Sequence, residues 1–151
     1  IRISSCEFCF SWIRKMKIMI ICSKYIYQKI PPIKKFLETK NHKITLPNSF
    51  ENPFKEEEMK DLSKKDHIKF KQKMMKLHSS TIKKNDAVLV LNLEKKGIPN
   101  YIGGATFMEI IKAWELNKKI FFFNPIPNCS FTDELTAINP IILNRDLLLI
   151  K

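Results

Sequence analysis

The chain has 151 residues, of which 44% are apolar, and carries a formal net charge of +12 at pH 7. This length fits one domain, and the apolar fraction excludes an intrinsically disordered chain. The positive charge favours nucleotides and other anions in general but identifies no partner.

The four cysteines are Cys6, Cys9, Cys22 and Cys129. Cys6 and Cys9 have the C-x-x-C spacing of a zinc or redox pair. No second such pair and no suitably spaced histidine pair accompanies them. We therefore expect no metal and no other cofactor, and a reducing, cytoplasmic location.

Residues 1–15 mix aromatic, cysteine and basic residues and lack the apolar centre of a signal peptide. The apolar run at 18–22 is too short to span a membrane, so no membrane partner is expected. We expect one domain over 16–151, preceded by a poorly packed extension over 1–15.

The first elements are predicted from short apolar runs. Residues 17–23, KIMIICS, form a continuous apolar run, which is typical of a buried parallel strand. Residues 24–41 have a helical composition, but Pro31 and Pro32 force a break or a new helix start. Residues 42–47 predict a second strand.

A polar region and a lysine-rich helix follow. Residues 48–63 predict a loop or a short excursion. Residues 64–84 predict an amphipathic helix that stops near Asn85. Its apolar residues are Ile68, Phe70, Met74, Met75, Leu77 and Ile82. We expect the lysines to form the solvated face, and a phosphate-binding patch is the alternative.

The last part of the chain alternates strands and helices. Strands are expected at 86–92, 118–125 and 140–144, and helices at 105–116 and 132–138. This alternation predicts a flavodoxin-like α/β fold: a doubly wound, parallel, five-stranded sheet with helices on both faces. Ligands of such sheets bind beyond the carboxyl ends of the strands, here at 22–28, 92–109 and 124–133.

All three glycines, Gly97, Gly103 and Gly104, lie within eight residues of one another. Gly103 and Gly104 precede the helix at 105–116, where glycine permits positive φ and a close approach to a ligand. Amides at the start of that helix favour an anion or a polarised hydroxyl, and Thr106 adds a hydroxyl group. A purely structural turn would use the same residues.

Glu109 lies in the same helix. A helical wheel predicts a core stripe of Phe107, Ile110, Ile111 and Trp114. Glu109 falls off this stripe, so the wheel alone predicts a solvated glutamate close to Lys112. Its place, about one turn into a helix that starts at the ligand edge, makes it a candidate for chemistry.

The run DAVLVLN…NYIGGATFMEIIKAWELNKKIFFFNPIP, within 86–127, resembles the nucleoside 2-deoxyribosyltransferase-like family. That family includes 2′-deoxynucleoside 5′-phosphate N-hydrolases, and the resemblance is to its small bacterial and archaeal members. It extends over about 16–150. It implies a flavodoxin-like homodimer that cleaves the N-glycosidic bond of a nucleoside or its 5′-monophosphate, with hydrolysis or base transfer.

The resemblance also implies roles for single residues. Glu109 matches the glutamate nucleophile. His78, eight residues before Asp86, stands where the family has an aspartate that serves the leaving base, although a half-buried structural histidine fits equally. The neighbouring subunit's contribution corresponds to 128–134. The substrate-binding candidates are Ser23, Asn92, Gly103, Gly104 and Thr106.

Other functions are compatible with the sequence. A non-catalytic nucleotide-binding protein on the same fold would explain three departures from the family: Cys22 at a common glycine position, the bulky Ile111, and the proline pair Pro31–Pro32 in the first helix. The lysines of 64–84 are compatible with a nucleic-acid-binding module. Aromatic residues are not regularly interleaved with these lysines and no known motif is present, so nucleic acid is not an expected partner. Phosphoribohydrolases share Gly-Gly and a threonine before a glutamate, but Ile102 and Ala105 do not match their motif.

Overall fold

The computed structural model describes residues 14–151. Cys6, Cys9 and all but the last two residues of the expected extension lie outside this range. Within the range, no helix is both long enough and apolar enough to cross a membrane.

Five parallel strands form one sheet in the order β2-β1-β3-β4-β5. Their bounds are β1 Lys17–Ile21, β2 Lys43–Thr45, β3 Ala87–Val90, β4 Lys119–Phe122 and β5 Ile141–Ile142. This order confirms the flavodoxin-like fold. The chain runs from β1 to one side and then returns to the other, so the switch point lies between β1 and β3.

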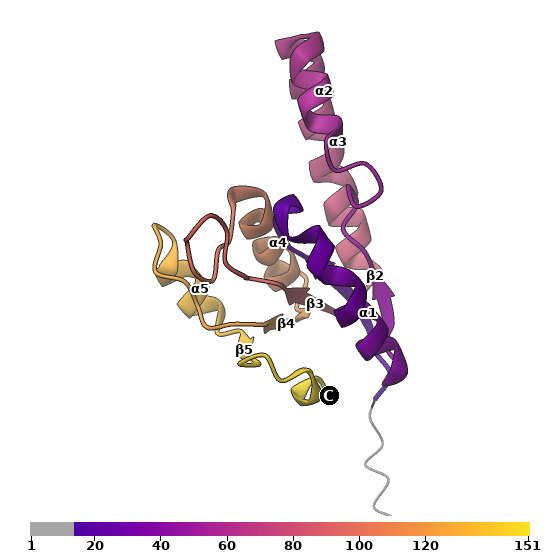
Figure 1. Cartoon of the computed structure of the whole chain (residues 1–151), viewed down its shortest axis with the longest axis vertical. Coiled ribbons are helices and arrows are strands. Elements are labelled where there is room, and N and C mark those ends of the chain that lie inside the picture. The colour runs from indigo at the N-terminus through magenta and orange to yellow at the C-terminus, as the bar shows by residue number, and fades with distance from the viewer. Residues whose placement is uncertain (1–13) are drawn as a thin grey trace, which may run out of the picture.

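Helices connect the strands (Figure 1). The α-helices are α1 Ile30–Thr39, α2 Lys55–Leu62, α3 Lys64–Lys83, α4 Gly104–Glu115 and α5 Thr132–Ile138, and two 3-10 helices are η1 Lys24–Lys29 and η2 Leu147–Leu149. Pro31 and Pro32 lie in the first turn of α1, where a missing N–H costs no hydrogen bond. The two prolines therefore start a helix, as predicted.

Two hydrophobic cores cover the two faces of the sheet. Side chains alternate along a strand, so Ile18 and Ile20 of β1 face α1, while Met19 and Ile21 face α3 and α4. Every residue of β3 is buried, as expected of a central parallel strand. The continuous apolar runs that predicted strands thus reflect burial on both faces.

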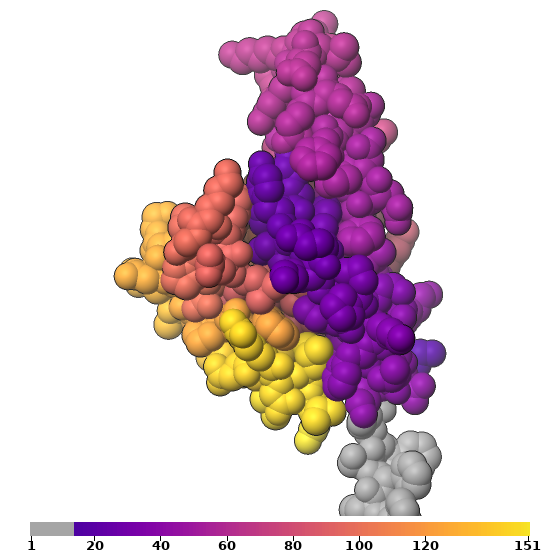
Figure 2. Space-filling view, viewed as in Figure 1, coloured from indigo at the N-terminus to yellow at the C-terminus, as the bar shows by residue number. Residues whose placement is uncertain are grey.

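The expected loop over 48–63 is wrong in its second half, because 55–62 form α2. With α3 it makes a hairpin that extends beyond the sheet (Figures 1 and 2). No residue of α2 is buried. Instead, Glu56 lies 3.0 Å from His67 Nε2 and 3.2 Å from Lys71 Nζ. A helix held by polar contacts has no apolar stripe, so its sequence carries no periodic signal.

The amphipathic helix at 64–84 is confirmed as α3, but half of its six apolar residues are exposed. Ile82 is its one buried residue, whereas Ile68 and Met75 are each 47% exposed and Leu77 is 41% exposed. Only the C-terminal end of α3 packs on the sheet. The rest of its apolar side remains accessible next to α4.

Candidate functional site

A cavity of about 260 Å³ opens at the carboxyl edge of the sheet. Its walls come from 22–27 after β1, 47–56 after β2, 70–78 of α3, and 95–109 around the start of α4. Two of the three segments expected at this edge are therefore present. Residues 124–133 line no part of it, and 47–56 take part although the sequence did not single them out.

Ser23, Gly103, Gly104 and Thr106 all line the cavity, as expected. The expectation of a positive φ at Gly103 and Gly104 is wrong, because among the three glycines only Gly97 has a positive φ. A Cβ on Gly103 would lie 3.2 Å from Tyr101 Oη, a tight contact that a small shift of the tyrosine ring would have to relieve. A Cβ on Gly104 would enter open space. Gly104 thus leaves room in the cavity.

Asn92 is placed differently from the other candidates. It is fully buried, and its Nδ2 donates to the carbonyls of Asn124 and Pro125, each at 2.9 Å. Its Oδ1 accepts from the amide of Asn124 at 2.8 Å. Asn92 lies outside the cavity wall and ties the end of β3 to the end of β4.

The helical wheel misplaced the buried side of α4. The buried residues are Thr106, Glu109, Ile110 and Ala113. Trp114 is 53% exposed, and Lys112 pairs with Glu115 at 2.6 Å, not with Glu109. The sheet and α3 both cover this helix, so the buried arc includes a position that hydrophobicity alone assigns to solvent.

Glu109 and His78 meet between the two helices. His78 Nδ1 lies 3.3 Å from Glu109 Oε1. Burial raises the pKa of Glu109 from 4.5 to about 8. Burial, and secondarily the charge of Lys71, lowers the pKa of His78. At pH 7 the two groups therefore form a neutral pair that holds one exchangeable proton, not an ion pair.

Lysines from three elements reach the cavity: Lys24 of η1, Lys71 of α3, and Lys95 of the loop after β3. Lys24 forms an ion pair with Glu57, and Lys71 forms one with Glu56. Both carboxylates belong to α2. The helix that sequence analysis missed therefore holds two of the cations at the site.

Lys95 also closes part of the cavity mouth. Its Nζ lies 4.5 Å from the ring centre of Tyr25 and 4.4 Å from that of Tyr101. Cation–π attraction thus links the loop after β3 to η1. Figure 2 shows the two segments side by side, with the loop in red-orange and η1 in indigo.

Asn48 is a cavity residue that the sequence did not reveal. Its Oδ1 lies 2.9 Å from Thr81 Oγ1, which is also 2.9 Å from the carbonyl oxygen of Leu77. Its Nδ2 is buried and has no hydrogen-bond partner among residues 14–151. A buried donor without an acceptor is costly, so a ligand oxygen or nitrogen would satisfy it. The available signal was its position three residues after β2, at the ligand edge.

Cys22 lies at the end of β1 on the cavity wall. Burial, and secondarily the charge of Glu109, raises its pKa to about 12, so it remains a thiol. Cys22 and Cys129 form no disulfide within the described range. That range also contains no cluster of three or more histidine, cysteine, aspartate or glutamate side chains able to hold a metal.

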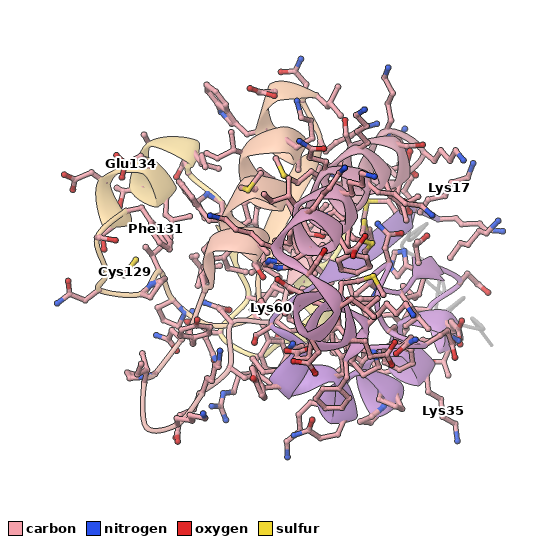
Figure 3. The ribbon with its side chains drawn as sticks, turned by 90° about the horizontal axis from the view of Figure 1, so that it is seen from above. Lys17, Lys35, Lys60, Cys129, Phe131 and Glu134 are labelled. Carbon is pink, nitrogen blue, oxygen red and sulfur yellow. The ribbon has the colours of Figure 1, made fainter. Side chains whose placement is uncertain are left out.

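The segment 128–134 lies apart from the cavity. Figure 3 shows Cys129, Phe131 and Glu134 on the α5 side of the molecule, away from the hairpin that carries Lys60. The ring of Phe131 stacks on Phe107 of α4 at 4.3 Å. The segment therefore does not contribute to the cavity of its own chain.

Comparison of the chain with models of known protein families gives no match, and comparison with curated proteins gives none either. The family resemblance of 86–127 therefore stays a prediction. The functional argument therefore depends on the geometry of the cavity and on the pair formed by Glu109 and His78.

Proposed function

We propose that the protein cleaves the N-glycosidic bond of a nucleoside or nucleoside 5′-monophosphate, with Glu109 as the nucleophile. The single observation that carries this proposal is the pair of Glu109 and His78, 3.3 Å apart on the cavity wall. A retaining glycosidic substitution needs a nucleophilic carboxylate on one face of the anomeric carbon and an acid for the leaving group on the other. After it takes the proton, the His78 ring must therefore turn from Glu109 toward the base.

The pair supplies both groups through one proton transfer. In the free protein Glu109 holds the proton, and His78 is neutral. When the proton passes to His78 Nδ1, Glu109 becomes a carboxylate and His78 an imidazolium. The carboxylate attacks C1′, the C1′–N bond breaks, and its electron pair stays on the base nitrogen. That nitrogen takes the proton from His78.

The second step restores the pair. Water attacks C1′ of the glycosyl ester and gives a proton to His78, and the C1′–O bond to Glu109 breaks. Glu109 leaves as a carboxylate and recovers the proton from His78. A second base can replace water in this step, which gives base transfer in place of hydrolysis.

Other cavity residues fit the sugar part of such a substrate. The unpartnered Nδ2 of Asn48 needs an acceptor, which a sugar hydroxyl or a phosphate oxygen provides. Lys95 favours an anionic group, and Lys24 and Lys71 can bind one in competition with Glu57 and Glu56. A homodimer belongs to the same proposal: 128–134, which lies away from its own cavity, would then act in the cavity of a second copy.

One observation favours a second candidate, a nucleotide-binding protein without catalysis. With a pKa of about 8, Glu109 is mostly protonated at neutral pH and is a poor nucleophile unless the proton moves. The bulky Ile111 gives this candidate no support, because it does not line the cavity. The test is whether a nucleotide that stabilises the protein also loses its base.

The experiment is chromatography of a panel of deoxynucleosides and deoxynucleotides after incubation with wild type, Glu109→Gln or Glu115→Gln. Wild type and Glu115→Gln release free base, and Glu109→Gln loses the release at least 100-fold while still binding ligand. The active pair needs one proton that can move between Glu109 and His78. The dependence of kcat/KM on pH should therefore be bell-shaped, with its alkaline limb near pH 8. Unchanged turnover in Glu109→Gln would remove Glu109 from the mechanism.

A further inference from the structure

A second cavity, of about 220 Å³, lies between α3 and α4. Five residues line both cavities: Lys71, Met74, His78, Ala105 and Glu109. The Glu109–His78 pair therefore stands where two cavities meet, and each cavity reaches it from a different side. A ligand that bridges the pair would extend into both.

The two cavities differ in chemistry. Lys71 lines both cavities, and the first adds Lys24, Lys95, the hydroxyl of Ser23 and the unpartnered amide of Asn48. The second adds Met75 and Met108 to the shared Met74, with the hydroxyl of Ser79 and the side chain of Lys112 beside them. The first cavity therefore has the more polar wall, and the second has the more apolar wall, which suits the faces of a flat ring.

We propose that the second cavity is the subsite for the nucleobase, with the sugar in the first cavity and the C1′–N bond at Glu109 and His78. This inference rests on the proposed function. Thioethers make favourable contacts with aromatic rings and adapt to rings of different size. A nucleoside divides into a polar sugar and a flat heteroaromatic base in the same way as the two cavities divide.

The position of the polar groups supports this orientation. His78 lies on the wall of the second cavity, where the departing base nitrogen requires its proton. Ser79, the next residue of α3, offers a hydroxyl to the edge of the base. Met75 and Met108 are each 47% exposed, so the base enters from solvent between α3 and α4.

Methionine methyl NMR tests the subsite directly, because the chain has six methionines. Met75 and Met108 line only the second cavity. Met16 and Met19 are buried in the sheet and Met59 lies on α2, so these three are internal controls. The probes are free adenine, hypoxanthine, cytosine and thymine, and separately 2-deoxyribose 5-phosphate.

At least one free base is expected to shift the Met75 and Met108 methyl signals through its ring current, with the controls unmoved. The sugar phosphate leaves both signals in place. Met108→Trp, at an exposed position, fills the cavity and weakens base binding at least 10-fold with sugar phosphate binding unchanged. Met59→Trp is the matched control and binds the base as wild type does.

Three results would overturn the subsite: no base moves Met75 and Met108, Met108→Trp binds base as wild type does, or the two signals move with protein concentration and not with base. The last result would make the α3–α4 groove an interface between copies. The methyl signals measure the binding of a free base, which involves no turnover. Base-dependent shifts without cleavage would support the subsite and refute the enzyme, whereas cleavage without such shifts would do the reverse.

Discussion

The buried carboxyl of Glu109 makes the stability of the fold depend on pH, and Glu109→Gln should remove that dependence. Glu109 is 6% exposed, and its Oε1 lies 3.3 Å from His78 Nδ1. Glutamine has nearly the same shape and cannot ionise. The substitution thus isolates the cost of burying an ionisable group from the packing around it.

The pKa of Glu109 sets the size and the sign of the effect. Between pH 4.5 and about 8 the unfolded chain has lost this proton while the folded protein keeps it. The folded state binds more protons, so the free energy of unfolding falls as pH rises, by about 1.4 kcal/mol per pH unit. From pH 5.5 to 7.5 the free energy of unfolding of the wild type should fall by about 3 kcal/mol relative to that of Glu109→Gln. Above about pH 8 the difference levels off, because the folded state ionises too.

Urea denaturation of both proteins at pH 5.5, 6.5, 7.5 and 8.5 measures the difference. With a slope near 2 kcal/mol per molar urea, the variant's midpoint should rise relative to wild type by about 1.5 M between pH 5.5 and 7.5. The lowered pKa of His78 acts in both proteins and cancels. The control is Glu115→Gln, at an exposed position on the same helix. Its midpoint should differ from that of wild type by the same amount at every pH. A constant difference for Glu109→Gln would refute the buried, neutral carboxyl.

Two further substitutions test the site's framework. Asn92→Asp loses both hydrogen bonds that Nδ2 donates and turns a buried carboxylate toward two carbonyls. The free energy of unfolding, measured in urea, should therefore fall by at least about 2 kcal/mol. The control is Asn117→Asp at an exposed position, which should stay within about 0.5 kcal/mol of wild type. A wild-type midpoint in Asn92→Asp would argue against this tie. Gly104→Ala should leave thermal stability equal or slightly higher, since alanine favours helix, yet weaken nucleotide binding measured by calorimetry, because the new Cβ enters open cavity space. Undiminished affinity would place the ligand elsewhere.

The strands illustrate what local sequence can predict. The runs at 17–23 and 86–92 are apolar at every position that the sheet buries, because a central parallel strand is covered on both faces. The prolines at 31 and 32 marked the start of α1 for an equally local reason, their fixed φ and missing N–H. Such signals depend on a residue and its neighbours in the chain.

The second helix and the buried arc of α4 show where local prediction fails. α2 packs through Glu56 and Glu57 on cations distant in sequence, and it has no apolar stripe to reveal it. Glu109 is buried because α3 covers the arc of α4 next to the sheet. A helical wheel treats a helix as having one covered side, so it assigned Glu109 to solvent and Trp114 to the core.

The sequence by itself determined the alternation of strands and helices, the ligand edge of the sheet, and Glu109 as a candidate there, because these follow from local patterns and from the topology that they imply. Only the tertiary structure brought His78 to 3.3 Å from Glu109, put Asn48 into the cavity and made Asn92 a tie between strands. Each of these depends on contacts between segments far apart in the chain. The raised pKa of Glu109 has the same origin, since burial by other elements, not the glutamate's neighbours in sequence, keeps it protonated.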